Sequence, residues 1–154
     1  MNRAAAKLVP VALSLLLLAA CSGSDSIVPG NAEDPRPFSE IGADEEMRFT
    51  GTEPFWGGSV VSESLAYTTP ENIDGTTIAV SRFAGRGGVT WSGMLDGQSF
   101  DLMVTPGKCS DGMSDKSYPF VATLQIGTQQ LEGCAWRASH PPADPVDKPA
   151  RQPA

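Results

Sequence analysis

The sequence is poor in the residue types that most catalytic and metal sites need. Histidine occurs once among 154 residues, at His140, where two prolines follow it. A Ser-His-Asp triad or a histidine zinc site needs histidine inside the fold, so this position argues against both. The three cysteines form no Cys-x-x-Cys pair, which argues against a redox-active dithiol. No phosphate-binding loop or dinucleotide fingerprint is present, and we expect no cofactor.

Basic residues are also scarce. The chain has 11 Lys and Arg against 18 Asp and Glu, a formal net charge of −7. Removal of residues 1–20 as a signal peptide would leave 9 of the 11 basic residues and all 18 acidic ones, a charge of −9. Such a balance argues against nucleic acid and against a polybasic hold on anionic lipid. It favours solubility, or a basic partner.

Long apolar runs are absent except for one near the N-terminus. Residues 8–20 read LVPVALSLLLLAA and follow the basic residues Arg3 and Lys7. This run is shorter than the roughly 20 residues of a membrane-spanning helix and has the layout of a secretory signal.

The run ends in LAAC, Leu18 to Cys21, which resembles the bacterial lipobox in all four positions. The resemblance implies cleavage before Cys21, a diacylglyceryl group on its thiol and a fatty acyl chain, such as palmitate, on its amine. Each buried methylene contributes about 0.8 kcal/mol, so two or more chains give a stable membrane anchor. Ser22 after the cysteine, by resemblance to common sorting signals, favours the outer membrane over the inner one, with the protein facing the periplasm. The alternative is a plain secretory signal that stops before a cysteine.

Two further segments have the composition of disordered chain. Residues 21–45 begin at the lipidated cysteine and are rich in Ser, Gly, Asp, Glu and Pro, which suits a flexible tether. Residues 139–154 contain five prolines and read as a disordered tail. One folded domain is left, residues 46–138.

Alternation of apolar and polar residues recurs throughout residues 46–138 and predicts half-buried strands. Residues 76–83 place Ile78 and Val80 on one face, and residues 118–127 place five apolar residues on one face. About eight short strands are expected, with turns between them. The turn signals are at Asn72–Gly75, Gly85–Gly88, Asp96–Gly97 and Ile126–Thr128. We therefore expect an all-β domain, a small antiparallel barrel or sandwich. No helical period is sustained outside the signal.

Cysteine usage predicts one disulfide. With Cys21 lipidated, Cys109 and Cys134 are an even pair in an exported protein, where a disulfide is the default. Closing a loop of this size contributes roughly 3–4 kcal/mol by the chain-entropy estimate.

GTEPFWGG, residues 51–58, is the first segment that could carry function. Pro54 should hold Glu53 extended. Phe55 and Trp56 should then point to opposite faces of a strand, one into the core and one to a rim. In a functional interpretation, Glu53 would be an acid or a ligand-contacting carboxylate beside an aromatic platform. The competing interpretation, which we favour, is that Pro54 starts a strand and Glu53 caps a turn. The tryptophans Trp56, Trp91 and Trp136 are expected mainly to pack the core.

CSDGMSDKSYPF, residues 109–120, is the second such segment. Asp111 and Asp115 lie four apart with no glutamate at the distance that an EF-hand calcium loop requires, so we expect no metal there. Asp111, Ser114 and Asp115 suit a turn in which side chains bond backbone amides. Ligand contact by these residues stays open as the alternative.

Together, GTEPFW and the C-x-DGMSD-x-x-YP…L-x-GCA pattern, within residues 47–137, resemble a family of uncharacterised bacterial envelope lipoproteins. Its members are similar in style to META-type domains and to c-type lysozyme inhibitors. The resemblance implies a disulfide between Cys109 and Cys134 and a small β-rich domain, but no activity.

These observations favour a membrane-anchored, non-catalytic β domain that binds or scaffolds a protein or small molecule. An inhibitor of a basic envelope-attacking enzyme such as lysozyme is the first alternative, because charge complementarity speeds association. A small-molecule, metal or enzymatic site around Glu53, Asp111 and Asp115 is the second.

Overall fold

A computed structural model describes residues 36–142, which contain eight strands. Within this range no helix is long and apolar enough to cross a membrane. The strands are β1 (Met47–Gly51), β2 (Trp56–Val61), β3 (Ser64–Thr69), β4 (Asn72–Ala84), β5 (Val89–Leu95), β6 (Gln98–Cys109), β7 (Tyr118–Ile126) and β8 (Gln129–Arg137).

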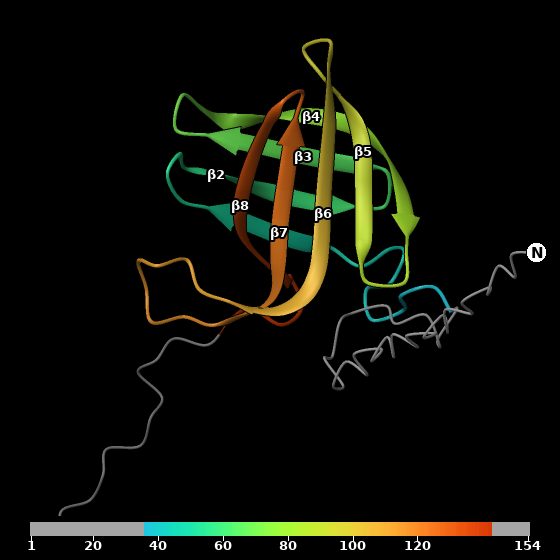
Figure 1. Ribbon diagram of the computed structural model, residues 1–154. Coiled ribbons are helices and arrows are strands. Elements are labelled where there is room, and N and C mark those ends of the chain that lie inside the picture. The colour runs from blue at the N-terminus through green and yellow to red at the C-terminus, as the bar shows by residue number, and fades with distance from the viewer. Residues whose placement is uncertain (1–35, 143–154) are drawn as a thin grey trace, which may run out of the picture.

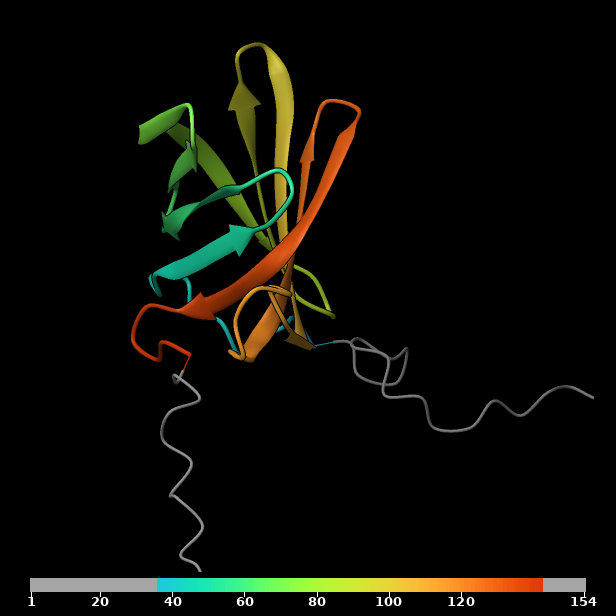
Figure 2. The ribbon, with the colours of Figure 1, turned by 90° about the vertical axis from the view of Figure 1, so that its left-hand side faces the viewer.

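The strands form a closed barrel in chain order, each antiparallel to the next, and β8 pairs with β1 to complete the wall. In Figure 1 the β1–β4 half runs almost at right angles to the β5–β8 half, and Figure 2 gives the view from the side. The predicted all-β fold of about eight strands is confirmed, and of the two expected architectures the structure has the barrel. Closure gives every strand two neighbours, although residues 72–79 of β4 pair only with β3 and keep a free edge.

Alternation fills the barrel with side chains as predicted. Ile78 and Val80 are buried at 3% and 5% exposure, while Thr77 and Ala79, on either side of Ile78, are exposed. The same pattern holds in β6 and β7, and Trp91 is among the largest fully buried side chains of the core. The interior is therefore a packed core.

Trp136, unlike Trp91, is only half-buried and packs against the ring of Tyr118, 5.4 Å between centroids. Trp56 and Trp91 pack the core as expected, whereas Trp136 does not belong to it.

Asp96–Gly97 forms the two-residue hairpin turn that was predicted. Leu95 pairs with Gln98 across it, and both turn residues have positive φ, 51° and 78°. That combination is typical of a type I′ turn, which glycine favours at the second position.

The turn predicted at Asn72–Gly75 is wrong in position. The chain reverses at residues 70–71, and β4 already begins at Asn72, opposite Thr69. Asn72 Oδ1 accepts a hydrogen bond from the Gly75 amide at 3.2 Å, and Gly75 has φ +80°. The turn-forming residues make an irregularity inside the strand, where the register shifts against β3.

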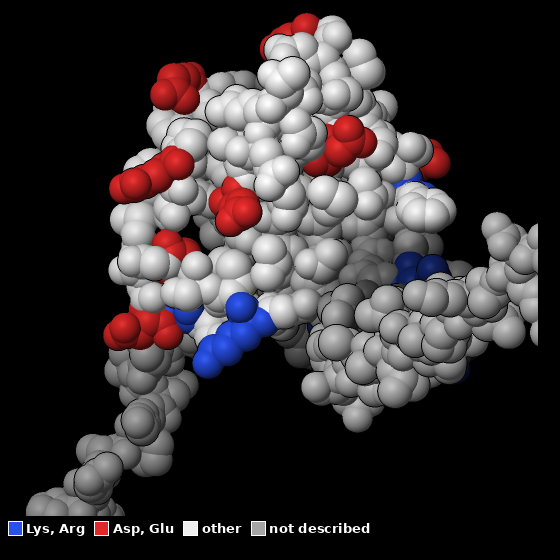
Figure 3. Space-filling model, viewed as in Figure 1, with Lys and Arg blue, Asp and Glu red and all other residues white. Residues whose placement is uncertain are grey.

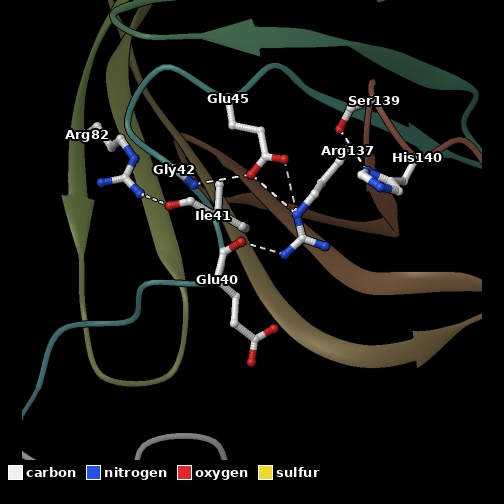
Figure 4. A network of polar contacts seen from close by, with 8 residues as sticks. All are labelled: Glu40, Ile41, Gly42, Glu45, Arg82, Arg137, Ser139 and His140. Carbon is white, nitrogen blue, oxygen red and sulfur yellow. Dashed lines mark hydrogen bonds and ion pairs between the residues drawn. The ribbon is translucent and has the colours of Figure 1, made fainter.

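Residues 36–45 were assigned to the tether, but they pack across one end of the barrel. Ile41 is 1% exposed and joins the core, with Phe38 packed beside it. Arg82 Nη2 donates to the Ile41 carbonyl at 2.6 Å, and Arg137 donates to the Glu40 carbonyl and to the Glu45 carboxylate. Figure 4 shows the two guanidinium groups reaching this segment from opposite sides. The composition of this segment did not predict its packing, because Ile41 is a single buried residue among polar neighbours.

The barrel therefore has two different ends. We call the end with residues 36–46 and the connections 62–63, 85–88 and 110–117 the covered end. The other end, with connections 52–55, 70–71, 96–97 and 127–128, is the mouth end. The mouth end lies at the upper left of Figure 1 and residues 36–46 lie at the lower right.

Candidate functional site

Asp111 organises the loop between β6 and β7. Its Oδ1 accepts hydrogen bonds from the amides of Met113 at 3.0 Å and Ser114 at 2.8 Å. Its Oδ2 accepts from the hydroxyls of Ser114 at 2.8 Å and Tyr118 at 2.9 Å. Four donors thus converge on one carboxylate, and the predicted side-chain-capped turn is present.

These hydrogen bonds shift the pKa values of Asp111 and Tyr118. Hydrogen bonds from the Ser114 amide and hydroxyl, and then from the Met113 amide, hold the pKa of Asp111 well below its usual range. Burial, and secondly the bond to Asp111, raise the pKa of Tyr118. Asp111 is therefore a permanently charged structural anchor at neutral pH, and its own loop occupies the acceptor sites that a ligand would need.

Asp115 and Ser114, the other candidates in this loop, lie differently. The Ser114 hydroxyl also accepts a hydrogen bond from the Lys116 amide at 3.3 Å, so it belongs to the turn. Asp115 is exposed and lines an open hollow of about 460 Å³ with Lys108. That hollow is bordered by charges of both signs.

The two candidate segments meet on the barrel wall. The disulfide Cys109–Cys134 that was predicted is present, with Cα atoms 5.6 Å apart, and it ties the end of β6 to β8 across β7. Next to it, the Thr52 hydroxyl donates to the carbonyl of Asp111 at 3.2 Å. The structure therefore brings GTEPFW and CSDGMSD side by side, although Thr52 and Asp111 are 59 positions apart in sequence.

The backbone at Glu53 differs from the prediction. Pro54 does not hold Glu53 extended, because Glu53 has φ 58° and the Glu53–Pro54 peptide bond is cis. The strand also begins at Trp56 and not at Pro54. Residues 52–55 form a tight connection that leaves the Glu53 side chain exposed at the mouth end.

Phe55 and Trp56 divide between rim and core as predicted. Trp56 is 4% exposed and packs on Phe49 with ring centroids 5.8 Å apart. Its indole also lies on Gly51, where a Cβ atom would overlap it, so only glycine fits there. Phe55 points outward and is 50% exposed.

A groove of about 320 Å³ lies beside Phe55, between the β1–β2 connection and the β3–β4 hairpin. Phe55 borders one side and Ile73, 79% exposed, borders the other, with Trp56 in the wall between them. The remaining lining residues are Thr50, Gly51, Gly57, Thr68, Thr69 and Pro70. Sequence reasoning missed Ile73, and the available signal was an isoleucine set inside a polar turn motif.

The surroundings of this groove are acidic. Glu53 lies two residues before Phe55, and Glu71 and Asp74 flank Ile73; all three are exposed. No Lys or Arg occurs anywhere in residues 49–81. Burial, and secondly the charge of Glu71, raise the pKa of Tyr67. Figure 3 shows carboxylates over the upper and left parts of the molecule, and most basic side chains lower down.

His140 and Cys21 are the remaining residues that the sequence analysis singled out. His140 is exposed after β8, with Nδ1 2.9 Å from the Ser139 hydroxyl, and Cys21 lies outside the described residues. Within residues 36–142 no three His, Cys, Asp or Glu side chains are grouped so that they could hold a metal ion.

Comparison with known proteins adds no further constraint. No protein-family model, curated protein or solved structure matches this chain. The resemblance to envelope lipoproteins therefore rests on the two quoted motifs alone.

Proposed function

We propose that this protein is a lipid-anchored envelope lipoprotein whose barrel binds a partner through its mouth end and has no catalytic activity. The observation that carries the proposal is the difference between the two ends. At the covered end, Ile41 is buried and two arginines bond its segment. The mouth end exposes Phe55 and Ile73 beside a groove. Apolar side chains gathered at a groove are typical of binding surfaces.

The chain direction supports this arrangement. Residue 36 enters the barrel at the covered end, so an anchor on Cys21 would attach the membrane to that end. The mouth end would then face away from the point of attachment. We propose the outer membrane, with the barrel in the periplasm, on the strength of LAAC followed by Ser22.

The hydrogen bonds of Asp111 in the β6–β7 loop support a binding role over catalysis. Asp111 is the most highly coordinated carboxylate in the candidate segments, and its four hydrogen bonds all come from residues of its own loop or from Tyr118. A general base or nucleophile needs a free acceptor aimed at a substrate.

Inhibition of a basic envelope-attacking enzyme such as lysozyme is a second candidate function. The acidic, lysine-free mouth end favours it, because complementary charge raises association rates and suppresses unsuitable partners. A cell-wall lysis assay with lysozyme and the purified protein would test it directly. No slowing of lysis at micromolar protein would remove this candidate.

Membrane fractionation tests the anchor. We expect wild type to sediment with the outer membrane and Cys21→Ser to appear in the soluble periplasmic fraction. Equal sedimentation of both forms would contradict the anchor.

Crosslinking in intact cells from a photoreactive residue at position 73, with position 83 as control, tests the binding surface. Partner capture from position 83 alone would overturn the assignment of the mouth end.

A further inference from the structure

We infer that the groove between Phe55 and Ile73 binds an extended segment of a basic protein, in which Lys or Arg stands next to an apolar side chain. This inference rests on the proposed binding function and names the site and the chemistry of the partner.

The apolar part of the site consists of two side chains that face one groove from different connections. Phe55 is 50% exposed on the β1–β2 connection, and Ile73 is 79% exposed at the start of β4. The groove between them has about 320 Å³, near the lower limit of small-molecule sites, and suits one inserted side chain.

The wall of this groove is fixed before any partner arrives. Trp56 packs on Phe49 and lies against Gly51, and it is almost fully buried. A preformed wall lowers the ordering cost of binding, so a short segment can gain useful affinity from few contacts.

Charge decides the kind of segment. Glu53, Glu71 and Asp74 are exposed around the groove, and none of them forms an ion pair with another described residue. The nearest stretch of chain on either side, residues 49–81, contains no cation that could neutralise them. A Lys or Arg in the partner therefore meets unpaired carboxylates, and an acidic segment would meet repulsion.

Strand addition alone would not select this partner. β1 pairs with both β2 and β8, whereas residues 72–79 of β4 pair only with β3 and keep a free edge. Backbone hydrogen bonds at that edge would be alike for any sequence. The choice of partner therefore depends on the apolar residue and its neighbouring cation.

The test uses a labelled short peptide that alternates lysine with leucine, and the complete chain carrying Cys21→Ser to keep lipid out of the assay. Fluorescence anisotropy would give its dissociation constant at low and at physiological ionic strength. We expect binding that weakens with salt, little binding of a glutamate–leucine peptide, and weaker binding of a lysine–serine peptide. Equal binding of the glutamate–leucine peptide, or none of the lysine–leucine peptide, would overturn the inference.

Matched variants locate the site on one strand. Ile73 and Phe83 are both exposed apolar residues of β4, but Phe83 lies toward the covered end and is 70% exposed. Ile73→Ser and Phe55→Ser should each weaken peptide binding about tenfold, and Phe83→Ser less than about twofold. Similar losses from Ile73→Ser and Phe83→Ser would overturn the inference.

Variants that remove carboxylate charges test the electrostatic part of the inference. Glu71→Gln with Asp74→Asn should weaken binding and flatten its salt dependence, whereas Glu63→Gln at the covered end should do neither. If crosslinking from position 73 captures a partner but the peptide does not bind, this inference fails while the proposed function stands. If neither gives a signal, both fail.

Discussion

The covered end and the mouth end are built from the same eight strands but present opposite surfaces. At the covered end, Ile41 is buried and the guanidinium groups of Arg82 and Arg137 hold its segment in place. At the mouth end, Phe55 and Ile73 are exposed and the nearby carboxylates lack ion-pair partners among the described residues. Under the proposed function, the covered end provides stability and the mouth end provides recognition, and substitutions can separate the two.

The disulfide should give the largest effect on stability. It closes 25 positions of sequence and holds the β6–β7 hairpin of the covered end against β8. The double substitution Cys109→Ser with Cys134→Ser should lower the free energy of unfolding by about 3–4 kcal/mol by the chain-entropy estimate. Urea denaturation would measure this loss. A loss below about 1 kcal/mol would mean that the rest of the covered end already fixes the hairpin.

Substitution of Ile41 should give the second largest loss of stability. Ile41→Ala removes a fully buried side chain and should cost about 3 kcal/mol. Ile73→Ala at the mouth end removes the same atoms from an exposed position and should change stability by less than about 0.5 kcal/mol. Comparable losses from both would contradict the assigned difference between the ends.

Arg137 is expected to have a smaller effect. It bonds the Glu40 carbonyl, pairs with Glu45 at 3.2 Å and lies over the Phe120 ring at 4.8 Å. Arg137→Ala should cost about 1–2 kcal/mol. The matched control is Arg48→Ala, which breaks an exposed ion pair with Glu46 and should cost less than about 0.5 kcal/mol. Thermal melts of the two variants, run together, would rank them.

Asp111 gives the smallest effect and one that depends on pH. Its pKa is lower in the folded state than in the unfolded chain, so its stabilisation is complete above the ordinary aspartate pKa, near 4. The stabilisation is lost as pH falls through the lowered folded-state value. The melting temperatures of wild type and Asp111→Asn should therefore differ at pH 7 and converge in acid. A constant difference across this range would show that shape, and not charge, is what Asp111 contributes.

Local patterns made much of the fold predictable. Apolar alternation predicted the strands, Asp96–Gly97 predicted its hairpin, and the two remaining cysteines predicted their bond. Each depends on residues close in sequence or on simple counting. Asn72–Gly75 misled because the residues that favour a reversal also favour an irregularity inside a strand.

Contacts between distant residues account for what the sequence did not reveal. Ile41 joins the core in a segment that Arg82 and Arg137 bond from 41 and 97 positions away in sequence. The Thr52–Asp111 contact likewise needs the disulfide-held hairpin to lean over the wall. Ile73 becomes part of a groove only when the β1–β2 connection lies beside it. The candidate residues Glu53, Phe55 and Trp56 were named in advance, but the opposite side of their groove was not.

Hydrogen–deuterium exchange with and without the lysine–leucine peptide would show which end of the barrel binds. We expect slower exchange in residues 52–57 and 68–76, which border the groove, and no change in residues 36–46 or 110–117. Protection confined to the covered end or to the Asp111 loop would contradict this expectation.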